Sequence, residues 1–430
     1  MTKLAKYPSY KNSGIEWLGD IPEHWEMIKV KNLSKLQKIK SFDKNPVILS
    51  LARDKIKVRD ISTGEGQIAA TYDGYNRVKT GDFLLNPMDL YSGANCNVSY
   101  LDGVISPSYI NLKFNRNIDV KYADFYFKLM YENMFLFSLG KGVSSENRWT
   151  LNNETLMNIK IPVPPLQEQE KIANYLDKKV SQIDTLIEQK QKLIELLKEQ
   201  KQIVINDVVT KGLDKNVELK ESGIEWIGKI PKHWEIKKLK NICIVNSKTL
   251  DENSNNNLEI KYVDIGSVSF ETGINKVENF LFSNAPSRAR RIVKKNDTII
   301  STVRTYLKAI DFIDELKAEY IFSTGFAVLE PEKNLEPIFL TFFVKSNFFT
   351  NQVDINSKGM SYPAINSTDL SNLIVLLPPK EEQIQIVEYI EKQISKIDSA
   401  IELEEKYIEK LKEYKTTLID SVVTGKVRVC

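Results

Sequence analysis

The chain contains few residues of the types that build metal centres and disulfide frameworks. Its 430 residues include only three cysteines (Cys96, Cys243 and Cys430) and two histidines (His24 and His233). Three widely spaced cysteines match neither a disulfide framework nor a zinc site, and they favour a reducing compartment. No run of 18 apolar residues could span a membrane, and the first residues lack the apolar core of a signal peptide. We therefore expect a cytoplasmic protein that binds no metal.

Catalytic motifs are also missing. The Gly-Lys pair nearest to a P-loop, in VVTGKVR, has no upstream glycine, and neither GxSxG nor HExxH occurs. A DNA methyltransferase would need a cofactor loop and a motif such as Asn-Pro-Pro-aromatic. The segment Asn86-Pro87-Met88-Asp89 lacks both the second proline and the aromatic residue. We expect no catalytic residue and no cofactor bound by this chain.

The charge is nearly balanced, with 60 basic and 57 acidic residues. Residues 1–160 hold 22 basic and 17 acidic residues, and residues 215–377 hold 21 and 20. Residues 161–214 and 378–430 are slightly acidic. Any phosphate contacts should therefore lie in residues 1–160 and 215–377, and DNA binding by this chain alone should be weak.

Two long stretches have the pattern of matching helices. Residues 164–212 begin with a proline pair and acidic residues, which suit the first turn of a helix, and contain no further proline or glycine before Gly212. Residues 378–424 repeat this pattern, displaced by 214 positions without a gap. About 41 helical residues would extend about 60 Å, at about 1.5 Å per residue.

Both stretches carry apolar residues at heptad spacing. A single helix of this length has nowhere to bury such a stripe, whereas two helices of equal length can bury each other's. We predict that the two helices pack antiparallel through the seam residues Ile183, Ile187, Ile194, Leu197, Val204, Ile397, Ile401, Ile408, Leu411 and Leu418. A generic coiled-coil stalk is the alternative, and two matched copies, each entered through a proline pair, make it less favoured.

A second repeat lies ahead of each helix. Residues 10–33 and 219–242 are identical at 15 of 24 positions, which indicates an internal duplication. His24 and His233 occupy equivalent places in this repeat, each before a tryptophan. No cluster of cysteines, histidines or carboxylates accompanies them, so we expect both histidines to be structural.

Short apolar runs punctuated by glycine, asparagine, aspartate and proline follow each opening, and they indicate β-rich domains. The predicted strands are Phe42–Leu51, Gln67–Tyr72, Asp82–Leu85 and Ser108–Phe114 in the first copy, and Ile260–Val268, Asp297–Val303 and Gly325–Leu329 in the second. A helix is predicted in each copy, at Lys121–Leu139 and Glu336–Phe349. Asp82 aligns with Asp297 and Ser106 with Ser323, but other positions between the openings and the long helices diverge.

The repeat is circular. The C-terminal VVTGKVRVC resembles the first part of the linker 208–226, and the N-terminal residues resemble the rest of that linker. We predict an α+β protein with a pseudo-two-fold internal repeat, in which two β-rich domains are separated by two long antiparallel coiled-coil helices. The predicted limits are 1–163 and 213–377 for the domains, 164–212 for the first helix, and 378–430 for the second helix and C-terminal tail.

Basic residues gather in the loops of both domains. Arginine can contact guanine through two hydrogen bonds, asparagine can contact adenine in the same way, and lysine suits phosphate. Each residue alone could equally belong to a solvated surface loop, but a set present in both copies favours DNA contact. The candidates are Arg53, Arg77, Lys79, Asn86, Lys141, Arg148, Arg288, Arg290, Arg291, Lys294, Arg304 and Lys358.

The chain resembles the specificity subunits of Type I restriction-modification systems. The resemblance rests on SGIEWLGDIPEHWE and SGIEWIGKIPKHWE, and on IPVPPLQEQEKIANYLDKKVSQID and VLLPPKEEQIQIVEYIEKQISKID. It covers essentially the whole chain in two repeats. One departure is Lys380, which stands where a leucine is commoner and where the first copy has Leu166.

The resemblance implies a non-catalytic DNA-binding subunit. Each β-rich domain would be a target-recognition domain that reads one half of an asymmetric bipartite site, and the helices would set the spacer. The implied partners are double-stranded DNA, two adenine methyltransferase subunits that use S-adenosylmethionine, and two restriction subunits that use ATP and Mg. A complex devoted to modification alone, a structural adaptor that does not bind DNA, and a self-sufficient enzyme are the alternatives.

Overall fold

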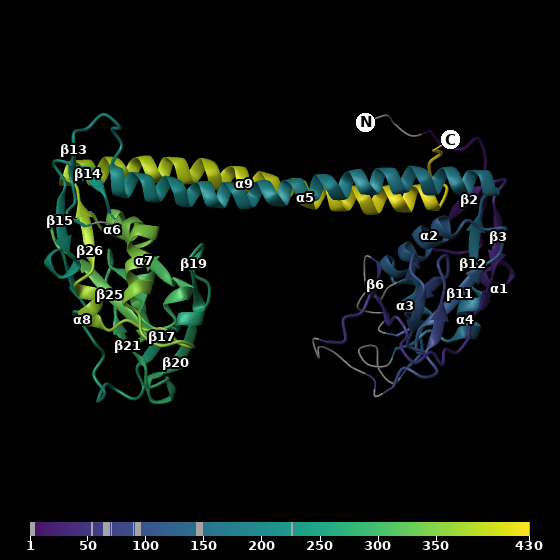
Figure 1. Ribbon diagram of the computed structural model, residues 1–430, viewed down its shortest axis with the longest axis horizontal. Coiled ribbons are helices and arrows are strands. Elements are labelled where there is room, and N and C mark those ends of the chain that lie inside the picture. The colour runs from purple at the N-terminus through teal and green to yellow at the C-terminus, as the bar shows by residue number, and fades with distance from the viewer. Residues whose placement is uncertain are drawn as a thin grey trace. The chain divides into compact units, whose positions relative to one another are not determined.

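Figure 1 shows the computed structural model of the chain, which describes residues 5–52, 55–62, 69, 71–88, 90, 96–142, 149–224 and 227–429. Contacts divide the chain into two compact units. Unit 1 comprises Met1–Lys190 and Lys406–Cys430, and unit 2 comprises Gln191–Glu405. Each long helix contributes to both units, so the predicted limits of the four segments stay a prediction. Among the described helices, none has both the length and the apolar composition needed to cross a bilayer.

Unit 1 combines many short strands with a few helices. Its helices are α1 (Val30–Leu33), α2 (Val120–Glu132), α3 (Phe135–Ser138) and α4 (Asn153–Asn158). Its strands are β1 (Tyr10–Asn12), β2 (Asp20–Pro22), β3 (Glu26–Lys29), β4 (Ser34–Leu36), β5 (Leu49–Leu51), β6 (Ile56–Val58), β7 (Asn76–Val78), β8 (Phe83–Leu85), β9 (Cys96–Val98), β10 (Gly103–Ile105), β11 (Ile110–Phe114) and β12 (Lys160–Val163).

Unit 2 likewise opens with three short strands and closes with three helices and a strand, and it differs between these parts. Its helices are α6 (Pro337–Val344), α7 (Asn347–Asn356) and α8 (Ser367–Ser371). Its strands are β13 (Leu219–Glu221), β14 (Lys229–Pro231), β15 (Glu235–Lys238), β16 (Cys243–Val245), β17 (Glu259–Val263), β18 (Val268–Ser269), β19 (Gly273–Ile274), β20 (Glu278–Leu281), β21 (Ala289–Ile292), β22 (Thr298–Ser301), β23 (Ile310–Phe312), β24 (Tyr320–Ser323), β25 (Phe326–Pro331) and β26 (Ile374–Leu377).

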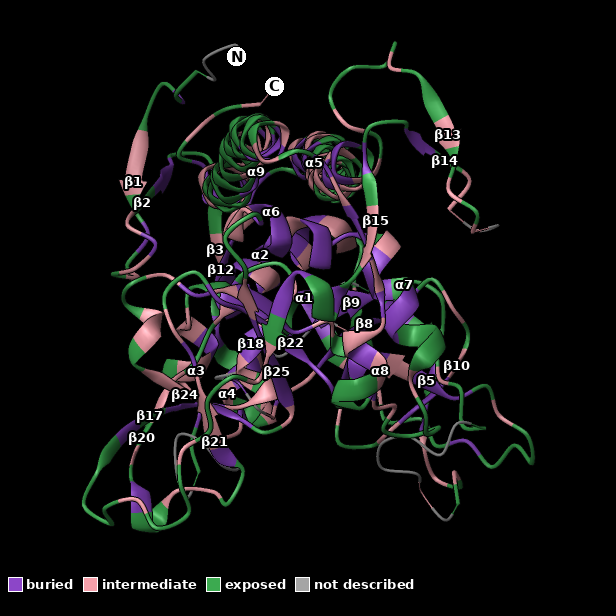
Figure 2. Ribbon diagram, turned by 90° about the vertical axis from the view of Figure 1, so that its left-hand side faces the viewer, coloured by how far each residue is buried: buried purple, intermediate pink, exposed green. Residues whose placement is uncertain are grey.

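One antiparallel sheet is common to both units. Its order is β4-β11-β8-β9 in unit 1 and β16-β25-β22-β23 in unit 2. The central strands β8 and β22 consist wholly of buried residues (Figure 2). Asp82 and Asp297 take equivalent places ahead of these strands, and each accepts a hydrogen bond from the main-chain N–H three residues earlier. The predicted internal repeat is thereby confirmed.

The units differ in a second sheet. Unit 2 has four strands in the order β20-β17-β24-β21, with β17 and β24 parallel. Among the described residues, the corresponding part of unit 1 consists of the pairs β5-β6 and β7-β10, connected by a parallel bridge between Ile48 and Val104. The two domains therefore share one sheet and present different surfaces beside it.

The long helices are α5 (Leu166–Lys211) and α9 (Lys380–Val423). They run antiparallel in each unit. In unit 1, Lys415 contacts both carboxylate oxygens of Asp184, at 2.7 and 2.9 Å. In unit 2, Lys201 contacts Asp398 in the same way, at 2.8 and 2.9 Å. All ten predicted seam residues are buried or half-buried, and Ile183, Ile397, Ile408 and Leu418 are the most buried.

A buried glutamine fastens the start of each long helix to its domain. Gln169 accepts a hydrogen bond from the Asp119 N–H at 2.7 Å, and its amide N–H groups donate to the carbonyls of Asn117 and Pro164. Gln383 repeats all three contacts with Glu336, Asn334 and Pro378. Each glutamine stands four residues after a proline pair, in PPLQEQ and PPKEEQ, so this repeated segment forms the joint between helix and domain.

The predicted circular arrangement is present in unit 1. The C-terminal segment returns to the N-terminal one, because Arg428 forms an antiparallel bridge with Ala5. Gly425, just after α9, lies against Pro22 and Trp25. In unit 2 the residue after α5, Gly212, lies against Trp234 in the same manner. The segment after α9 therefore packs against the domain of unit 1 and then ends. The segment after α5 packs against the domain of unit 2 in the same way, and the chain then continues into that domain.

Several predicted boundaries were wrong. The predicted helix 121–139 is two helices, because Met134 takes a left-handed φ of 56° between α2 and α3. The predicted helix 336–349 is also two, because the Ser346 side chain caps a new helix, α7. Phe42–Leu51 is a strand only in β5, and Ile260–Val268 is interrupted by a 3₁₀ turn at Ile265–Ser267. Of the predicted strand 67–72, residues 67, 68 and 70 lie outside the described residues, and residues 69, 71 and 72 belong to no strand.

Candidate nucleic-acid interface

The basic run 288–295 of unit 2 is mostly engaged by its own domain. The Arg288 guanidinium donates to Asp264 at 2.8 Å and to the Tyr262 hydroxyl at 3.1 Å. Arg291 donates to the Phe326 carbonyl, and Lys294 pairs with Glu330 at 2.5 Å. Arg290 lies over the Phe282 ring, 4.7 Å from its centroid. The run therefore presents less free charge than its sequence suggests.

The predicted contacts of unit 1 are engaged in a similar way. Arg77 pairs with Asp43 at 3.2 Å, and Lys79 pairs with Asp102 at 2.6 Å. The hydrogen bonds from Lys79 and the Thr80 N–H lower the pKa of Asp102 to about 2. Exposed pairs of this kind are weak and can exchange partners, so both cations remain able to meet phosphate.

The remaining candidates for DNA contact in unit 1 are Asn86, Lys141, Arg53 and Arg148. Asn86 is half-buried, its side-chain oxygen accepts from the Met88 N–H, and its main-chain carbonyl accepts from the Tyr131 hydroxyl. Lys141 is exposed on a main-chain bridge to Thr150. Arg53 and Arg148 lie outside the described residues. Of the described candidates, Asn86 is therefore the least suited to contact a base.

Arg304 and Lys358 of unit 2 are brought together by two loops, 303–308 and 357–364, which we call the paired loops. Val303 and Lys358 each form an antiparallel bridge with Ala364. The hydroxyls of Thr305 and Ser357 lie 3.1 Å apart. The main-chain bridges and this side-chain contact hold the two loops together. The backbone that bears their exposed side chains is therefore well ordered.

The paired loops expose aromatic and apolar side chains beside cations. Met360 is fully exposed, at 102% of its reference area, and Tyr362 and Tyr306 are 60% and 56% exposed. The Arg304 guanidinium lies over the Tyr362 ring, 5.0 Å from its centroid. Arginine on an aromatic face, next to further exposed rings and an apolar tip, suits stacking on bases and contact with phosphates.

The backbone of these loops is strained where the cations are placed. Arg304 has a φ of 54° and Lys308 has a φ of 46°, both in the left-handed region. Residues other than glycine in this region cost free energy and tend to occur at functional sites. Arg304 and Lys358 are among the candidates predicted from the sequence, whereas Met360, Tyr362 and Tyr306 are not. The glycine and aromatic residues of SKGMSYP, beside Lys358, were the available signal.

The described cysteines take no part in this surface. Cys96 and Cys243 are free and buried, and burial raises the pKa of each thiol. In the described part of the chain, no group of three or more histidine, cysteine, aspartate or glutamate residues could hold a metal ion.

Comparison with known proteins identifies the family. The Type I restriction modification DNA specificity domain matches residues 22–196 and 231–413. The Type I restriction enzyme MjaVIII specificity subunit of Methanocaldococcus jannaschii is 27% identical, over 95% of this chain and 94% of that protein. The Type I restriction enzyme EcoBI specificity subunit of Escherichia coli is 26% identical, over 80% of this chain and 73% of that protein.

Solved structures show the same fold. A chain from a study of complex assembly and conformational transition of the type I R-M system aligns with a TM-score of 0.70 and 17% identity, over 94% of this chain and 98% of that one. The HsdS subunit from Thermoanaerobacter tengcongensis aligns with a TM-score of 0.57 and 17% identity, over 95% and 98%. With both sequence repeats matched and the fold shared, this chain belongs to the family of Type I restriction-modification specificity subunits.

Proposed function

We propose that each globular domain reads one half of a bipartite, asymmetric DNA site. The observation that carries this proposal is the repeat itself, in which a shared sheet supports two different surfaces. In unit 2 the paired loops supply the candidate contacts, with Arg304, Lys358 and Met360 at their surface. Different surfaces on a common frame suit two different half-sites read by one subunit.

The long helices would set the spacing between half-sites and bind two methyltransferase subunits. With 46 residues in α5 and 44 in α9, each helix has a contour of about 65–70 Å at a rise of about 1.5 Å per residue. Helix α5 also has an exposed apolar stripe at heptad spacing, formed by Leu186, Leu193, Leu196 and Ile203. An exposed stripe of this kind suits packing against a helix of another subunit.

The chemistry would belong to the partners. Methyltransferase subunits would use S-adenosylmethionine to modify an adenine in each half-site, flipping the base out of the duplex to reach it. Two restriction subunits that use ATP and Mg would complete a restriction complex in the cytoplasm. A complex that performs modification alone would use this chain in the same way.

Single-molecule sequencing of adenine methylation tests the proposal. The host would carry this chain together with its neighbouring methyltransferase subunit, and a strain with the methyltransferase subunit alone would be the control. We expect one gapped, asymmetric motif with a methylated adenine in each half, on opposite strands. A short ungapped palindrome, or no methylation, would contradict separate reading by two domains and favour an adaptor that does not bind DNA.

A further inference from the structure

The internal repeat allows one lysine to be compared in two settings. Gln169 contacts the Asp119 N–H and Gln383 contacts the Glu336 N–H, so the segments that follow these residues superpose in register. In this register Lys128 of α2 is equivalent to Lys345, which directly follows α6. Both lysines thus come from the same position of the same structural repeat.

Only the lysine of unit 1 has an acidic partner. The Lys128 ammonium donates to Asp124 at 2.6 Å, one turn earlier on α2. The position equivalent to Asp124 is Thr341, whose hydroxyl lies 2.7 Å from that of Thr298. The half-buried Lys345 ammonium forms no hydrogen bond or ion pair with any described residue, and burial lowers its pKa. Unit 2 therefore keeps the cation of the repeat without the internal anion.

Lys345 lines a cavity of about 880 Å³ within unit 2. The cavity lies between α6, the adjoining parts of α5 and α9, and the hairpin formed by β18 and β19. Its apolar lining consists of Ile205, Phe270, Phe342, Ile394 and Ile401. A cavity of this size and composition is large enough to enclose several side chains of a bound molecule.

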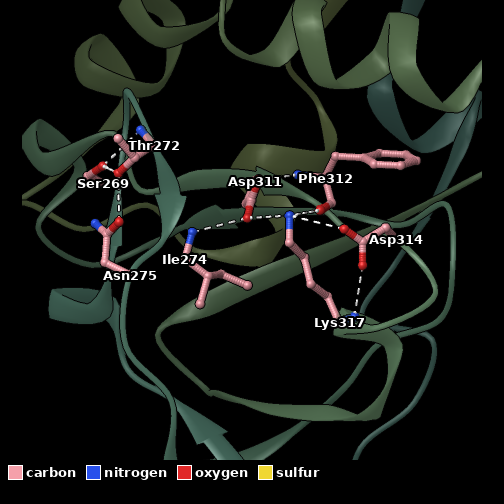
Figure 3. Close-up of polar contacts among 8 residues, drawn as sticks. All are labelled: Ser269, Thr272, Ile274, Asn275, Asp311, Phe312, Asp314 and Lys317. Atoms are coloured by element: carbon pink, nitrogen blue, oxygen red, sulfur yellow. Dashed lines mark hydrogen bonds and ion pairs between the residues drawn. The ribbon is translucent and has the colours of Figure 1, made fainter. Parts of the chain in front are cut away.

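Three nearby acids, Asp311, Asp398 and Glu271, are engaged by groups other than Lys345. Asp311 accepts hydrogen bonds from the N–H groups of Ile274 and Phe312, and it pairs with Lys317 at 3.0 Å (Figure 3). In the cavity wall, Asp398 pairs with Lys201 and Glu271 pairs with Lys198. These three acids are therefore engaged, and the two other acids that line the cavity, Glu391 and Glu405, form no hydrogen bond or ion pair with Lys345.

The hairpin that forms one wall is held in place by Asp311. Gly273 has a φ of +70°, and a Cβ atom at this position would lie 2.6 Å from the Asp311 carboxylate. A residue with a side chain could not occupy position 273 without displacing Asp311. Ser269, Thr272 and Asn275 close the turn through side-chain hydrogen bonds (Figure 3). Phe270 and Glu271 are therefore carried on a braced turn rather than a loose loop.

The remaining charges favour a protein ligand over nucleic acid. Glu391 and Glu405 also line the cavity, and neither forms an ion pair with a described residue. A DNA phosphate would be attracted by Lys345 but repelled by these two carboxylates, and it would gain nothing from the apolar lining. A protein segment can offer an acidic group to Lys345, basic groups to the glutamates, and apolar side chains to the lining.

We propose that this cavity seats a segment of the methyltransferase subunit, with apolar side chains in the cavity and an acidic side chain paired with Lys345. The inference rests on the proposed function, because it assumes that this chain recruits such a subunit. It adds a defined contact in unit 2 that lies beside the helices rather than on their exposed stripe.

Binding of the purified methyltransferase subunit to the full chain, measured by calorimetry, tests this inference. Lys345→Met and Thr341→Asp should each raise Kd about tenfold or more, the first by removing the cation and the second by giving it an internal partner as in unit 1. Lys333→Met, which changes an exposed lysine of unit 2, should leave Kd unchanged. Unchanged binding by both cavity variants would overturn the inference while leaving the proposed function standing.

A crosslinking experiment does not depend on the stability of these variants. Benzoylphenylalanine placed at position 270 should crosslink to the methyltransferase subunit in the assembled complex on DNA, and the same group at the exposed position 316 should not. Crosslinking from position 270 to DNA would overturn the inference in favour of a nucleic-acid site. If the unmodified chain failed to bind the methyltransferase subunit at all, the docking part of the proposed function would fail as well.

Discussion

His24 and Glu168 lie 2.8 Å apart, and their counterparts in unit 2, His233 and Glu382, lie 2.7 Å apart. Each glutamate also accepts a hydrogen bond from the indole N–H of the neighbouring tryptophan, Trp25 or Trp234. The two histidines of the chain therefore join a domain opening to the first turn of a long helix. This structural role agrees with the expectation drawn from their position in the repeat.

Replacing either glutamate should loosen this joint. Glu168→Ala and Glu382→Ala each leave a buried indole N–H without its acceptor, so we expect a loss of about 2 kcal/mol in the free energy of unfolding. Urea unfolding, followed by tryptophan fluorescence, measures this free energy of unfolding. Glu170→Ala, an exposed change two residues further along α5, is the control and should cost no more than about 0.5 kcal/mol. Equal losses for Glu168→Ala and the control would show that the joint does not stabilise the fold.

The two glycines that end the long helices should differ in their tolerance of alanine. Both have a left-handed φ, 76° at Gly212 and 77° at Gly425, so alanine should cost about 1 kcal/mol at each. A Cβ at Gly425 would also lie 2.4 Å from Pro22, whereas at Gly212 the nearest atom is a flexible Glu382 oxygen at 3.0 Å. We therefore expect Gly425→Ala to be the more destabilising in thermal unfolding.

Gly19→Ala is the matched control for this pair. Gly19 has a φ of 70° and no heavy atom within 4 Å of the position of a Cβ. Gly19→Ala should therefore lose only the free energy that alanine costs in the left-handed backbone conformation. A loss for Gly425→Ala no greater than that for Gly19→Ala would mean that the C-terminal segment moves away from Pro22 without cost.

Asp297 should make stability depend on pH. Burial raises its pKa from 3.8 to about 6, so between these values the folded chain binds a proton that the unfolded chain does not. This group therefore stabilises the fold increasingly as the pH falls from about 7 to about 4. The stability of the wild type relative to Asp297→Asn should rise over that range in urea titrations. A difference that is constant with pH would contradict the assignment.

The paired loops should contribute to DNA binding. Arg304→Ala and Met360→Ala should each weaken binding of the assembled methyltransferase to its target duplex by about tenfold, because each removes a group that can stack on or insert between bases. Fluorescence anisotropy at fixed salt measures the change. Leu316→Ala removes another exposed apolar side chain of unit 2, 78% exposed, and should have no effect. Full affinity in both loop variants would exclude the paired loops from the interface.

Lengthening both helices should lengthen the spacer. Seven residues inserted after Lys190 and seven after Glu405 fall where the two units meet along each helix, so the contacts within each unit are kept. The added turns extend the helices by about 10 Å, or about 3 base pairs of DNA. Methylation sequencing should then report the same half-sites with a longer gap. An unchanged gap would show that the helices do not set it.

The sequence alone determined the duplication, the two long helices and their seam. Heptad spacing and the absence of proline and glycine are local features, and they specify a helix with an apolar face wherever it packs. The proline pairs also predicted the helix starts to within two residues, since the helices begin at Leu166 and Lys380. Short strands were harder to predict, because their edges depend on partners from other parts of the chain.

Only the tertiary structure decided which charged groups are available. Arg288, Lys294 and Lys79 looked alike as basic loop residues, yet each is paired with an acid more than 20 residues away in the sequence. Arg304 meets Tyr362 although the two residues are 58 positions apart in the sequence. Lys345 forms no ion pair with a described residue, and Thr341 stands where unit 1 has Asp124. An ion pair or a ring contact needs two groups within a few ångströms of each other, and folding rather than sequence spacing sets that distance.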